Sequence, residues 1–340
     1  MKKTWIRIGI LFLGMGLWCL SLSFLREMEM QAGTFNGYYT TSVFTPADLQ
    51  RFEEQAEHPE SLPKITGWVK DEKQPIKGEV RESVMGNVWK IAGSMESFFQ
   101  GQLSGGSYPW EEDEEGCMVS ESLAEKLFGT QEVQGNQIEI AGEKYYIRGC
   151  IKSKETFAAV FAGKEEPMQG LFLEYSDKRE AASTAQDLFT QMTGREPDGF
   201  WEGNLYSALA RILMALPIWI PALVFVKKAY GQTNRISVYS LRISVKLFAA
   251  AIVCGLVAFG FWITLKFSAD YLPAMWSELD FFPELIAKKQ KAFQEVCQFA
   301  LCPADERMLM NLKKIVWAVF GSVLAEAIFL AGDKTKKEDT

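Results

Sequence analysis

The chain has 340 residues, of which 48% are hydrophobic and 23% are charged, with a formal net charge of −7. Its hydrophobic residues gather in long runs without charge, which indicates a membrane protein, and its acidic balance argues against a nucleic acid partner, whose phosphates it would repel. The sequence contains no GxxxxGK[ST], GxSxG or HExxH pattern, so it lacks the signatures of a P-loop ATPase, a serine hydrolase and a zinc protease.

The first predicted element is a membrane span at residues 5–25. Within it, residues 8–25 carry no charge and follow basic residues at positions 2, 3 and 7, which indicates an anchor that enters from the cytoplasm. The alternative is a cleaved signal peptide, but the apolar run continues past Cys19 without a small-x-small cleavage site. We therefore expect an uncleaved anchor.

Residues 30–204 are predicted to form an extracytoplasmic domain of α+β (mixed α/β) fold. Between residues 31 and 204 the sequence has 30 acidic and 16 basic residues, which indicates an acidic outer surface. Strands are expected at 41–44, 65–69, 85–88 and 172–175, and helices from Thr45-Pro46 onward and over 178–192. The alternation of strands and helices predicts a mixed fold.

A more specific pattern occupies residues 117–152. Residues 117–119 form a short apolar strand, Ser120 is a good N-cap for a helix, and Gly129 ends that helix. Ile138 and Ile140 then alternate with polar residues, and a tight turn at 141–143 returns the chain as a second strand. The predicted unit is strand, helix, hairpin.

The remaining predicted segments are spans at 207–226, 247–267 and 313–332, a basic cytoplasmic loop at 227–246, an extracytoplasmic loop at 268–312 and a cytoplasmic tail at 333–340. Each span is long enough, at ~1.5 Å per residue, to cross most of the hydrocarbon core. Basic residues in the 227–246 loop and the tail place both termini in the cytoplasm. Lys313 and Lys314, on the outer side of the fourth span, are a mild exception.

The sequence LAEKLFG at 123–129, the glycine at 135 and the strand IRG at 147–149 resemble the periplasmic core domain of MacB-type ABC transporter permeases, in the FtsX-like superfamily. GQLSGGSY at 101–108, followed by an acidic loop, resembles the segment that precedes the same strand in that family. One span, a large outer domain and three further spans are also that family's layout.

The resemblance implies a multi-pass permease subunit in the plasma membrane, in contact with lipid and paired as a homo- or heterodimer. A separate ATPase subunit would bind ATP, so this chain would have no cofactor and would not be an enzyme. ATP-driven movement of the spans would move the outer domain, which would contact a cargo that the sequence does not identify.

The inner loop departs from the family pattern, because the glutamate-isoleucine-glycine sequence of the family's coupling helix is missing from 227–246. Arg235, Tyr239 and Arg242 are the candidate residues for docking on an ATPase, although a positive-inside loop explains the same residues. The alternative function is therefore a membrane-anchored signalling or scaffold protein that has a MacB-like outer domain and no ATPase coupling. An ectoenzyme is the third hypothesis.

Four of the six cysteines lie in the predicted outer segments, where disulfides are permitted. Cys117 and Cys150 occupy two strands expected to be neighbours, and Cys297 and Cys302 flank a small loop, so we predict a bridge within each pair. For Cys117 and Cys150 the alternative is two separately buried thiols, which behave as small hydrophobic side chains. Because His58 is the single histidine and no CxxC pair exists, we predict no metal site.

Charged residues inside the predicted spans are also candidates. Glu326 lies in the fourth span, where an ionisable group usually faces another helix or a water-filled path, and either a relay role or neutralisation by Lys227 or Lys228 would explain it. Arg211, near the outer end of the second span, is expected to snorkel. The acidic run at 111–115 is interpreted as a solvated turn, since it lacks the alternating spacing of a calcium loop.

Overall fold

The computed structural model describes residues 2–79, 83–178, 181–233, 239–264 and 280–331. The chain divides into two compact units. The helical unit comprises Met1–Ala32, Gly203–Ala269 and Arg307–Thr340, and the sheet unit comprises Gly33–Glu202 and Asp270–Glu306. Residues 280–306 of the predicted 268–312 loop therefore group with the sheet unit, and residues 268–279 lie outside the described residues.

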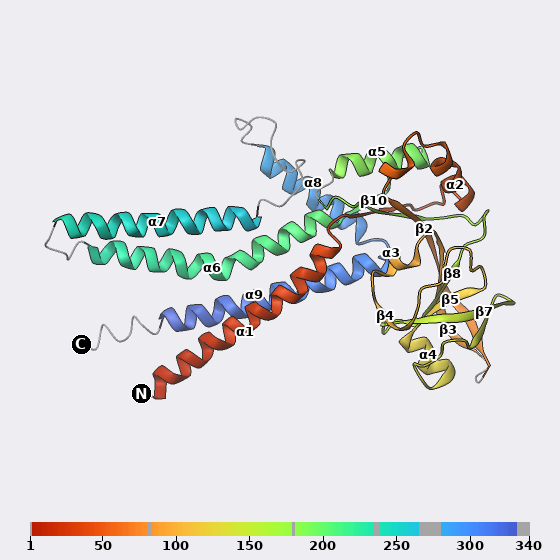
Figure 1. Ribbon diagram of the computed structural model, residues 1–340, viewed down its shortest axis with the longest axis horizontal. Coiled ribbons are helices and arrows are strands. Elements are labelled where there is room, and N and C mark those ends of the chain that lie inside the picture. Colours follow the sequence, from red (N-terminus) through yellow and green to blue (C-terminus); the bar gives the residue numbers. More distant parts are fainter. Residues whose placement is uncertain (1, 80–82, 179–180, 234–238, 265–279, 332–340) are drawn as a thin grey trace. The chain divides into compact units, whose positions relative to one another are not determined.

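The helical unit is built from long helices (Figure 1), namely α1 (Lys2–Met30), α6 (Gly203–Thr233), α7 (Tyr239–Thr264) and the larger part of α9 (Pro303–Ala331). Among the described residues, Trp5–Met30 and Gly203–Val224 are long and apolar enough to cross a membrane, and α7 contains a shorter apolar stretch at Ile243–Leu256. The third predicted span overlaps α7 and the fourth overlaps α9, while residues 265–267 and 332 lie outside the described residues. As membrane spans both stay predictions.

Helix α1 contacts both α6 and α9. The indole Nε1 of Trp18 donates a hydrogen bond to the backbone oxygen of Met214 in α6, at 3.0 Å. On the α9 side, a Cβ on Gly14 would lie 2.8 Å from the Cβ of Ala325, and a Cβ on Gly321 would lie 2.9 Å from Leu17. Glycine at these positions lets the two helix backbones approach closely, as small residues do between membrane helices.

The sheet unit contains one mixed sheet, with strands β1 (Thr34–Tyr38), β2 (Lys64–Gly78), β3 (Val84–Ala92), β4 (Leu103–Gly106), β5 (Gly116–Ser120), β6 (Gln137–Ile140), β7 (Glu143–Ile151), β8 (Phe157–Phe161), β9 (Gly170–Glu174) and β10 (Gly199–Glu202). In the described part of the chain the strand order is β10-β1-β9-β2-β3-β8-β5-β7-β4, and β6 pairs with β2 and β7. The β3–β8 and β5–β7 pairs are parallel, and the other pairs are antiparallel.

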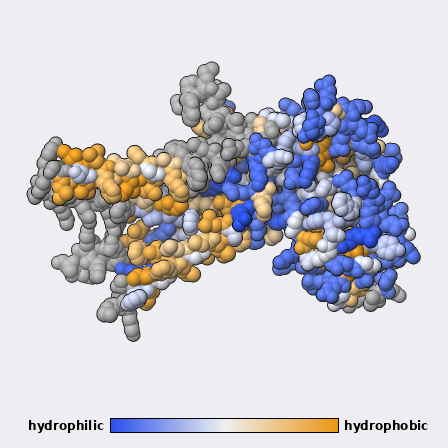
Figure 2. All heavy atoms as spheres, in the orientation of Figure 1, coloured by the Kyte–Doolittle hydropathy of each residue, from blue (hydrophilic) through white to orange (hydrophobic). Residues whose placement is uncertain are grey.

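The shorter helices of this unit are α2 (Pro46–Gln55), η1 (Pro59–Ser61), α3 (Met95–Phe99), α4 (Glu121–Phe128), α5 (Ala182–Thr193) and α8 (Phe281–Val296). Strands and helices alternate along the chain, so the predicted α+β (mixed α/β) class is confirmed. Hydrophilic residues cover much of the visible surface over the sheet unit, whereas hydrophobic residues gather along the long helices (Figure 2).

Most predicted strands of the outer domain lie where expected, inside β2, β3 and β9, and α2 begins with a complete capping box between Thr45 and Asp48. The strand predicted at 41–44 is wrong. Strand β1 lies earlier, at Thr34–Tyr38, where all five residues are buried between β9 and β10. Residues 41–44 retain a single bridge, from Phe44 to Met168, because the chain has already left the sheet.

The strand–helix–hairpin unit predicted at 117–152 is confirmed as β5, α4, β6 and β7. The Ser120 hydroxyl accepts a hydrogen bond from the Leu123 backbone N–H at 3.1 Å, and Gly129 ends α4 with φ +74°. The hairpin turn uses Ala141 (φ 54°) and Gly142 (φ 92°), the left-handed pair that a two-residue hairpin of type I′ requires.

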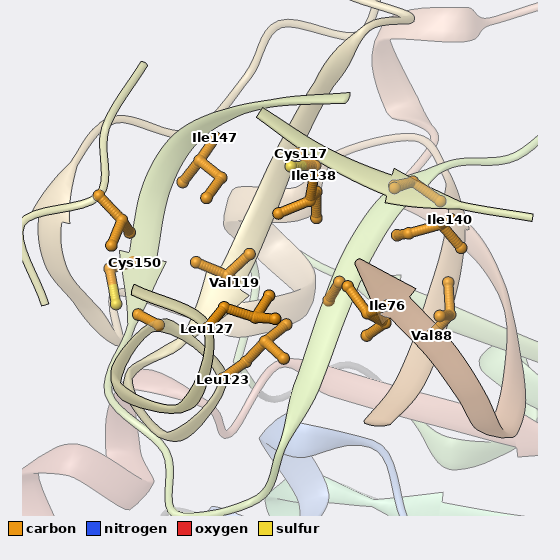
Figure 3. Packing of buried hydrophobic residues seen from close by; sticks show 14 residues of the cluster. Ile76, Val88, Cys117, Val119, Leu123, Leu127, Ile138, Ile140, Ile147 and Cys150 are labelled. Atoms are coloured by element: carbon orange, nitrogen blue, oxygen red, sulfur yellow. The ribbon is translucent and has the colours of Figure 1, made fainter. Parts of the chain in front are cut away.

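This unit encloses a hydrophobic core, in which α4 packs on the sheet (Figure 3), with contributions from Ile76, Val88, Cys117, Val119, Leu123, Leu127, Ile138, Ile140, Ile147 and Cys150. A second core lies around Phe35, Leu49, Leu171 and Phe189, under α2 and α5. Of the LAEKLFG residues that carry the family resemblance, Leu123, Ala124 and Leu127 belong to the first core and Phe128 packs against it.

Candidate functional site

Two neighbouring strands at one edge of the sheet lead directly into the long helices. Strand β1 follows α1 after residues 31–33, and β10 ends at Glu202, immediately before α6 begins at Gly203. The two strands pair antiparallel, with Phe35 opposite Glu202. The first four residues of α9, 303–306, also belong to the sheet unit. We call this β10–β1 edge, together with residues 281–306, the junction.

A buried polar network lies at the centre of the junction. The Asp305 carboxylate accepts two hydrogen bonds at Oδ2, from the Tyr38 hydroxyl at 2.6 Å and from Nδ2 of Asn36 at 2.9 Å. The Tyr38 hydroxyl in turn accepts from the backbone N–H of Cys302, at 3.1 Å. Nε1 of Trp68, on β2, donates to Oδ1 of Asn36 at 3.2 Å. The network thus joins two strands to the start of α9.

The three central side chains have almost no contact with solvent, since Asn36 is 0%, Tyr38 1% and Asp305 1% exposed. Burial raises the pKa of Asp305 to about 7, although the hydrogen bonds from Tyr38 and Asn36 act in the opposite direction. The pKa values of Tyr38 and Cys302 are raised well above their ordinary values, also mainly by burial. A buried carboxylate is costly without such donors, so its position is closely specified.

Two further contacts hold residues 281–306 on the same edge. The Lys289 ammonium on α8 pairs with the Glu202 carboxylate, the last residue of β10, and both side chains are mostly buried. The Phe299 ring lies 5.5 Å from that of Tyr38, centroid to centroid. A Cβ on Gly199 of β10 would lie 3.0 Å from the Phe299 ring, so glycine leaves room for it. The segment is therefore attached to both β1 and β10.

All six cysteines are free thiols in the structure, which therefore contains neither predicted disulfide. On β5 and β7, Cys117 lies opposite Ile147 and Cys150 lies opposite Val119, so the two thiols face other residues of one core rather than each other. Cys302 is buried in the junction, with its Sγ 3.0 Å from Nδ2 of Asn36, while Cys297 is exposed. Separate buried thiols, the alternative for Cys117 and Cys150, therefore describe that pair, and Cys302 is a further buried thiol.

We expect a membrane-impermeant maleimide, applied to intact cells, to label Cys297 and to leave Cys117, Cys150 and Cys302 unmodified. Burial raises the pKa of each of those three thiols and so suppresses the reactive thiolate. Mass spectrometry of the digested protein provides the measurement, and a Cys297→Ser variant is the control. Labelling of Cys297 that appears only after treatment with a reductant would instead reveal a Cys297–Cys302 bridge.

The candidate docking residues of the inner loop are only partly within the described chain. Arg235 lies outside the described residues, and Tyr239 and Arg242 lie in the first turns of α7. Helix α6 extends to Thr233, so the described parts of the 227–246 loop are mostly helical. The structure therefore leaves the docking role of these three residues as a prediction.

Of the charged residues in the long helices, Arg211 forms an ion pair with α1, while its snorkelling stays a prediction. Arg211 is 7% exposed, and its Nε donates a hydrogen bond to Oε1 of Glu29 on α1 at 2.9 Å. A nearby helix contact is similar, with Nδ2 of Asn311 on α9 donating to Oε2 of Glu27 at 2.8 Å. An ion pair between two helices therefore satisfies the charge of Arg211.

Glu326 lies within α9, partly buried, and its Oε2 has no hydrogen-bond partner among the residues that the structure describes. In the acidic run at 111–115, the Asp113 carboxylate accepts two hydrogen bonds from the Arg148 guanidinium, at 2.7 Å from Nε and at 3.1 Å from Nη2. His58 is exposed, with Nδ1 3.6 Å from a Glu60 oxygen. Glu326, Asp113 and His58 therefore all lie outside the junction.

No motif in the sequence identifies the junction residues Asn36, Tyr38 and Asp305. One weak signal was present, because Asn36 and Tyr38 are two residues apart and so share one face of a strand. Asp305, 267 residues after Tyr38, offered no local indication of its partners.

No protein-family model matches the chain, and no curated protein matches it. Solved structures similar to part of it include the periplasmic region of MacB from Actinobacillus actinomycetemcomitans (12% identity, TM-score 0.40, covering 50% of this chain and 87% of that one). Another is the extracellular domain of the noncanonic ABC-type transporter YknZ from Gram-positive bacteria (14%, 0.37, 49% and 97%). A third is a domain of a permease protein from Porphyromonas gingivalis (14%, 0.34, 48% and 83%). Because these likenesses are partial, we infer function from the residues of this chain.

Proposed function

We propose that this chain is a permease-like membrane subunit of a MacB-type ABC transporter, which couples a separate ATPase to movement of an extracytoplasmic domain. One observation carries the proposal. A mixed α/β unit, containing the strand–helix–hairpin of the resemblance, is inserted in the chain between the long apolar helices α1 and α6. The insertion reproduces the order of span and outer domain that the resemblance implies.

The surface of the long helices supports a location in the plasma membrane. Helix α1 exposes Trp5 (70%) and Phe12 (67%), α7 exposes Phe248 (70%), and α9 exposes Trp317 (73%) and Phe320 (60%). A water-soluble protein rarely leaves so many large apolar side chains uncovered, whereas lipid would cover them. With the basic residues of the 227–246 loop on the cytoplasmic side, four spans would place both termini inside and the sheet unit outside.

Energy would come from a partner, since the sequence has no P-loop of its own. In this proposal an ABC ATPase docks on the inner loop at Arg235, Tyr239 and Arg242, and a second permease subunit completes a homo- or heterodimer. ATP binding then moves the spans, and the spans move the sheet unit, which contacts the cargo. This chain itself would hold no cofactor and catalyse no reaction.

A second candidate function rests on the missing glutamate-isoleucine-glycine pattern in the inner loop. Without that pattern the chain would be a membrane-anchored signalling or scaffold protein, and its sheet unit would bind an outer partner without ATPase coupling. The two candidates differ in whether a stoichiometric ATPase accompanies the chain.

We expect an ABC ATPase to co-purify with the tagged full-length chain from its native membrane in mild detergent, and the eluate to hydrolyse ATP. Alanine at Arg235, Tyr239 and Arg242 together should reduce both the bound ATPase and the activity at least tenfold, because the docking surface is lost. Mass spectrometry of the eluate and phosphate release provide the measurements.

The matched control replaces Lys227 and Lys228, which are basic residues of the same loop, with alanine. If the 227–246 loop only fixes the orientation of the chain in the membrane, the docking variant and the Lys227/Lys228 variant will lose activity to the same extent. That result would show that the docking assignment is wrong. If outer-surface partners appear and no ATPase is present at stoichiometric amount, the scaffold function replaces the transporter function.

A further inference from the structure

Helix α9 is the one described helix whose residues are divided between the two units. It runs without interruption over Pro303–Ala331, and its first four residues belong to the sheet unit while the rest belong to the helical unit. An unbroken helix transmits displacement along its axis better than an irregular connection does, because its backbone hydrogen bonds hold its length. In contrast, α1 is separated from β1 by the turn at residues 31–33.

The first turn of α9 is also the part that carries the buried network. Asp305 binds Tyr38 and Asn36 of β1, and the backbone N–H of Cys302, just before the helix, binds Tyr38. Hydrogen bonds of 2.6 to 3.1 Å lose their strength when donor and acceptor separate by about 1 Å. A slide of α9 along β1 would therefore break the network, unless the strand moved with the helix.

A polar attachment of this kind specifies position more closely than an apolar one does. A buried carboxyl group that loses its hydrogen-bond partners is left unsatisfied, which costs free energy in either protonation state. The surroundings are apolar and aromatic, with Trp68 and Phe299 against Tyr38, so water would not replace the lost donors.

We propose that Asp305, together with Asn36 and Tyr38, is a clamp that transmits movement of the fourth span to the β10–β1 edge of the outer domain. This inference rests on the proposed function and identifies the residues through which that function acts outside the membrane. Lys289 and Glu202 add a second attachment, between α8 and β10. Force from α9 would thus reach β1 directly and β10 through its pairing with β1.

The test uses the full chain in lipid nanodiscs with its ATPase, and measures amide hydrogen exchange with and without ATP. Tyr38→Phe removes one hydroxyl and keeps the ring. Tyr39→Phe is the matched control, because the neighbouring Tyr39 is equally buried but its hydroxyl contacts Thr193 outside the clamp. Asp305→Asn is the second variant, which keeps the size of the side chain and removes its charge.

Without ATP, we expect exchange at residues 302–306 to be roughly tenfold faster in Tyr38→Phe than in the natural chain, since the Cys302 amide loses its acceptor. With ATP, the natural chain and Tyr39→Phe should show a change of exchange in β1 and β10. Tyr38→Phe and Asp305→Asn should lose that change while ATP hydrolysis stays within about twofold, because the clamp acts after hydrolysis.

The clamp is wrong if both variants keep the ATP-dependent change in β1 and β10 of the natural chain. It is a structural support and not a transmitting element if hydrolysis and exchange response decline together in Asp305→Asn, Tyr38→Phe and Tyr39→Phe alike. A natural chain with no ATPase, or without any response to ATP, overturns the proposed function, and the coupling role of the clamp with it. In that case, faster exchange at residues 302–306 in Tyr38→Phe would still show that the clamp attaches the start of α9 to β1, without a role in coupling.

Discussion

Alanine at Gly170 is expected to destabilise the sheet unit by about 3 kcal/mol, at the upper end of the usual cost of overpacking a core. Gly170 of β9 lies directly opposite Trp68 of β2, and a Cβ on it would lie 2.0 Å from the Trp68 ring. The ring has no free space to move into, because it packs on Trp89, Phe98 and Tyr38. Thermal unfolding of the detergent-solubilised chain, followed by near-UV circular dichroism, measures the effect.

Gly163→Ala is the matched control, since a Cβ there meets nothing within 4 Å. We expect that variant to unfold within about 0.5 kcal/mol of the natural chain. An equal stability of the two variants would show that Trp68 can adopt another rotamer in the aromatic cluster. Because Trp68 also donates to Asn36, Gly170→Ala should further speed amide exchange in the first turn of α9.

The second large effect is expected for Leu127→Ala, in the LAEKLFG segment of α4. Leu127 is fully buried against the sheet core, and its removal leaves a cavity that costs about 2 to 5 kcal/mol. The side chain of the exposed Glu125, two residues earlier, accepts a hydrogen bond from Nε2 of Gln131 at the surface, so Glu125→Ala should cost under about 0.5 kcal/mol. The same unfolding measurement compares the two variants.

The outcome would also separate two interpretations of the family resemblance. If the loss of function in Leu127→Ala is no larger than its loss of stability explains, the LAEKLFG motif specifies the fold of the outer domain. A loss of function in a chain that unfolds at the natural temperature would instead assign the α4 segment a direct role in binding.

Local signals explain why the strand–helix–hairpin unit could be predicted. Ser120 provides a side-chain oxygen for the first turn of α4, Gly129 accepts a left-handed conformation, and Ala141-Gly142 forms a tight turn. Each of these causes acts over a few residues, so the sequence displays them directly. The same reasoning placed α2, through the capping box at Thr45 and Asp48.

The errors arose where distant partners decide the structure. Residues 41–44 have the composition of a strand, but β9 and β10 pair with Thr34–Tyr38 instead. Cys117 and Cys150 looked suitable for a bridge because their strands were expected to be neighbours, yet the register of β5 and β7 places each thiol opposite another residue. Asp305 resembled an ordinary acidic residue in the first turn of a helix, and only the folded chain shows that it meets Tyr38.

The pairing of β1 with β10 has a consequence for the origin of this architecture. The points where the chain enters and leaves the main segment of the sheet unit lie on adjacent strands, about 4.8 Å apart, which is the spacing that an inserted domain needs in order to leave its host undisturbed. Exchange of residues 33–202 between related subunits would therefore preserve the connections to α1 and α6. A functional graft would also have to include residues 281–306 of the donor subunit. Asn36, Tyr38 and Glu202 contact that segment, and the corresponding segment of the recipient would have to match them. The outer domain thus consists of two separate pieces of sequence whose contacting residues have to match.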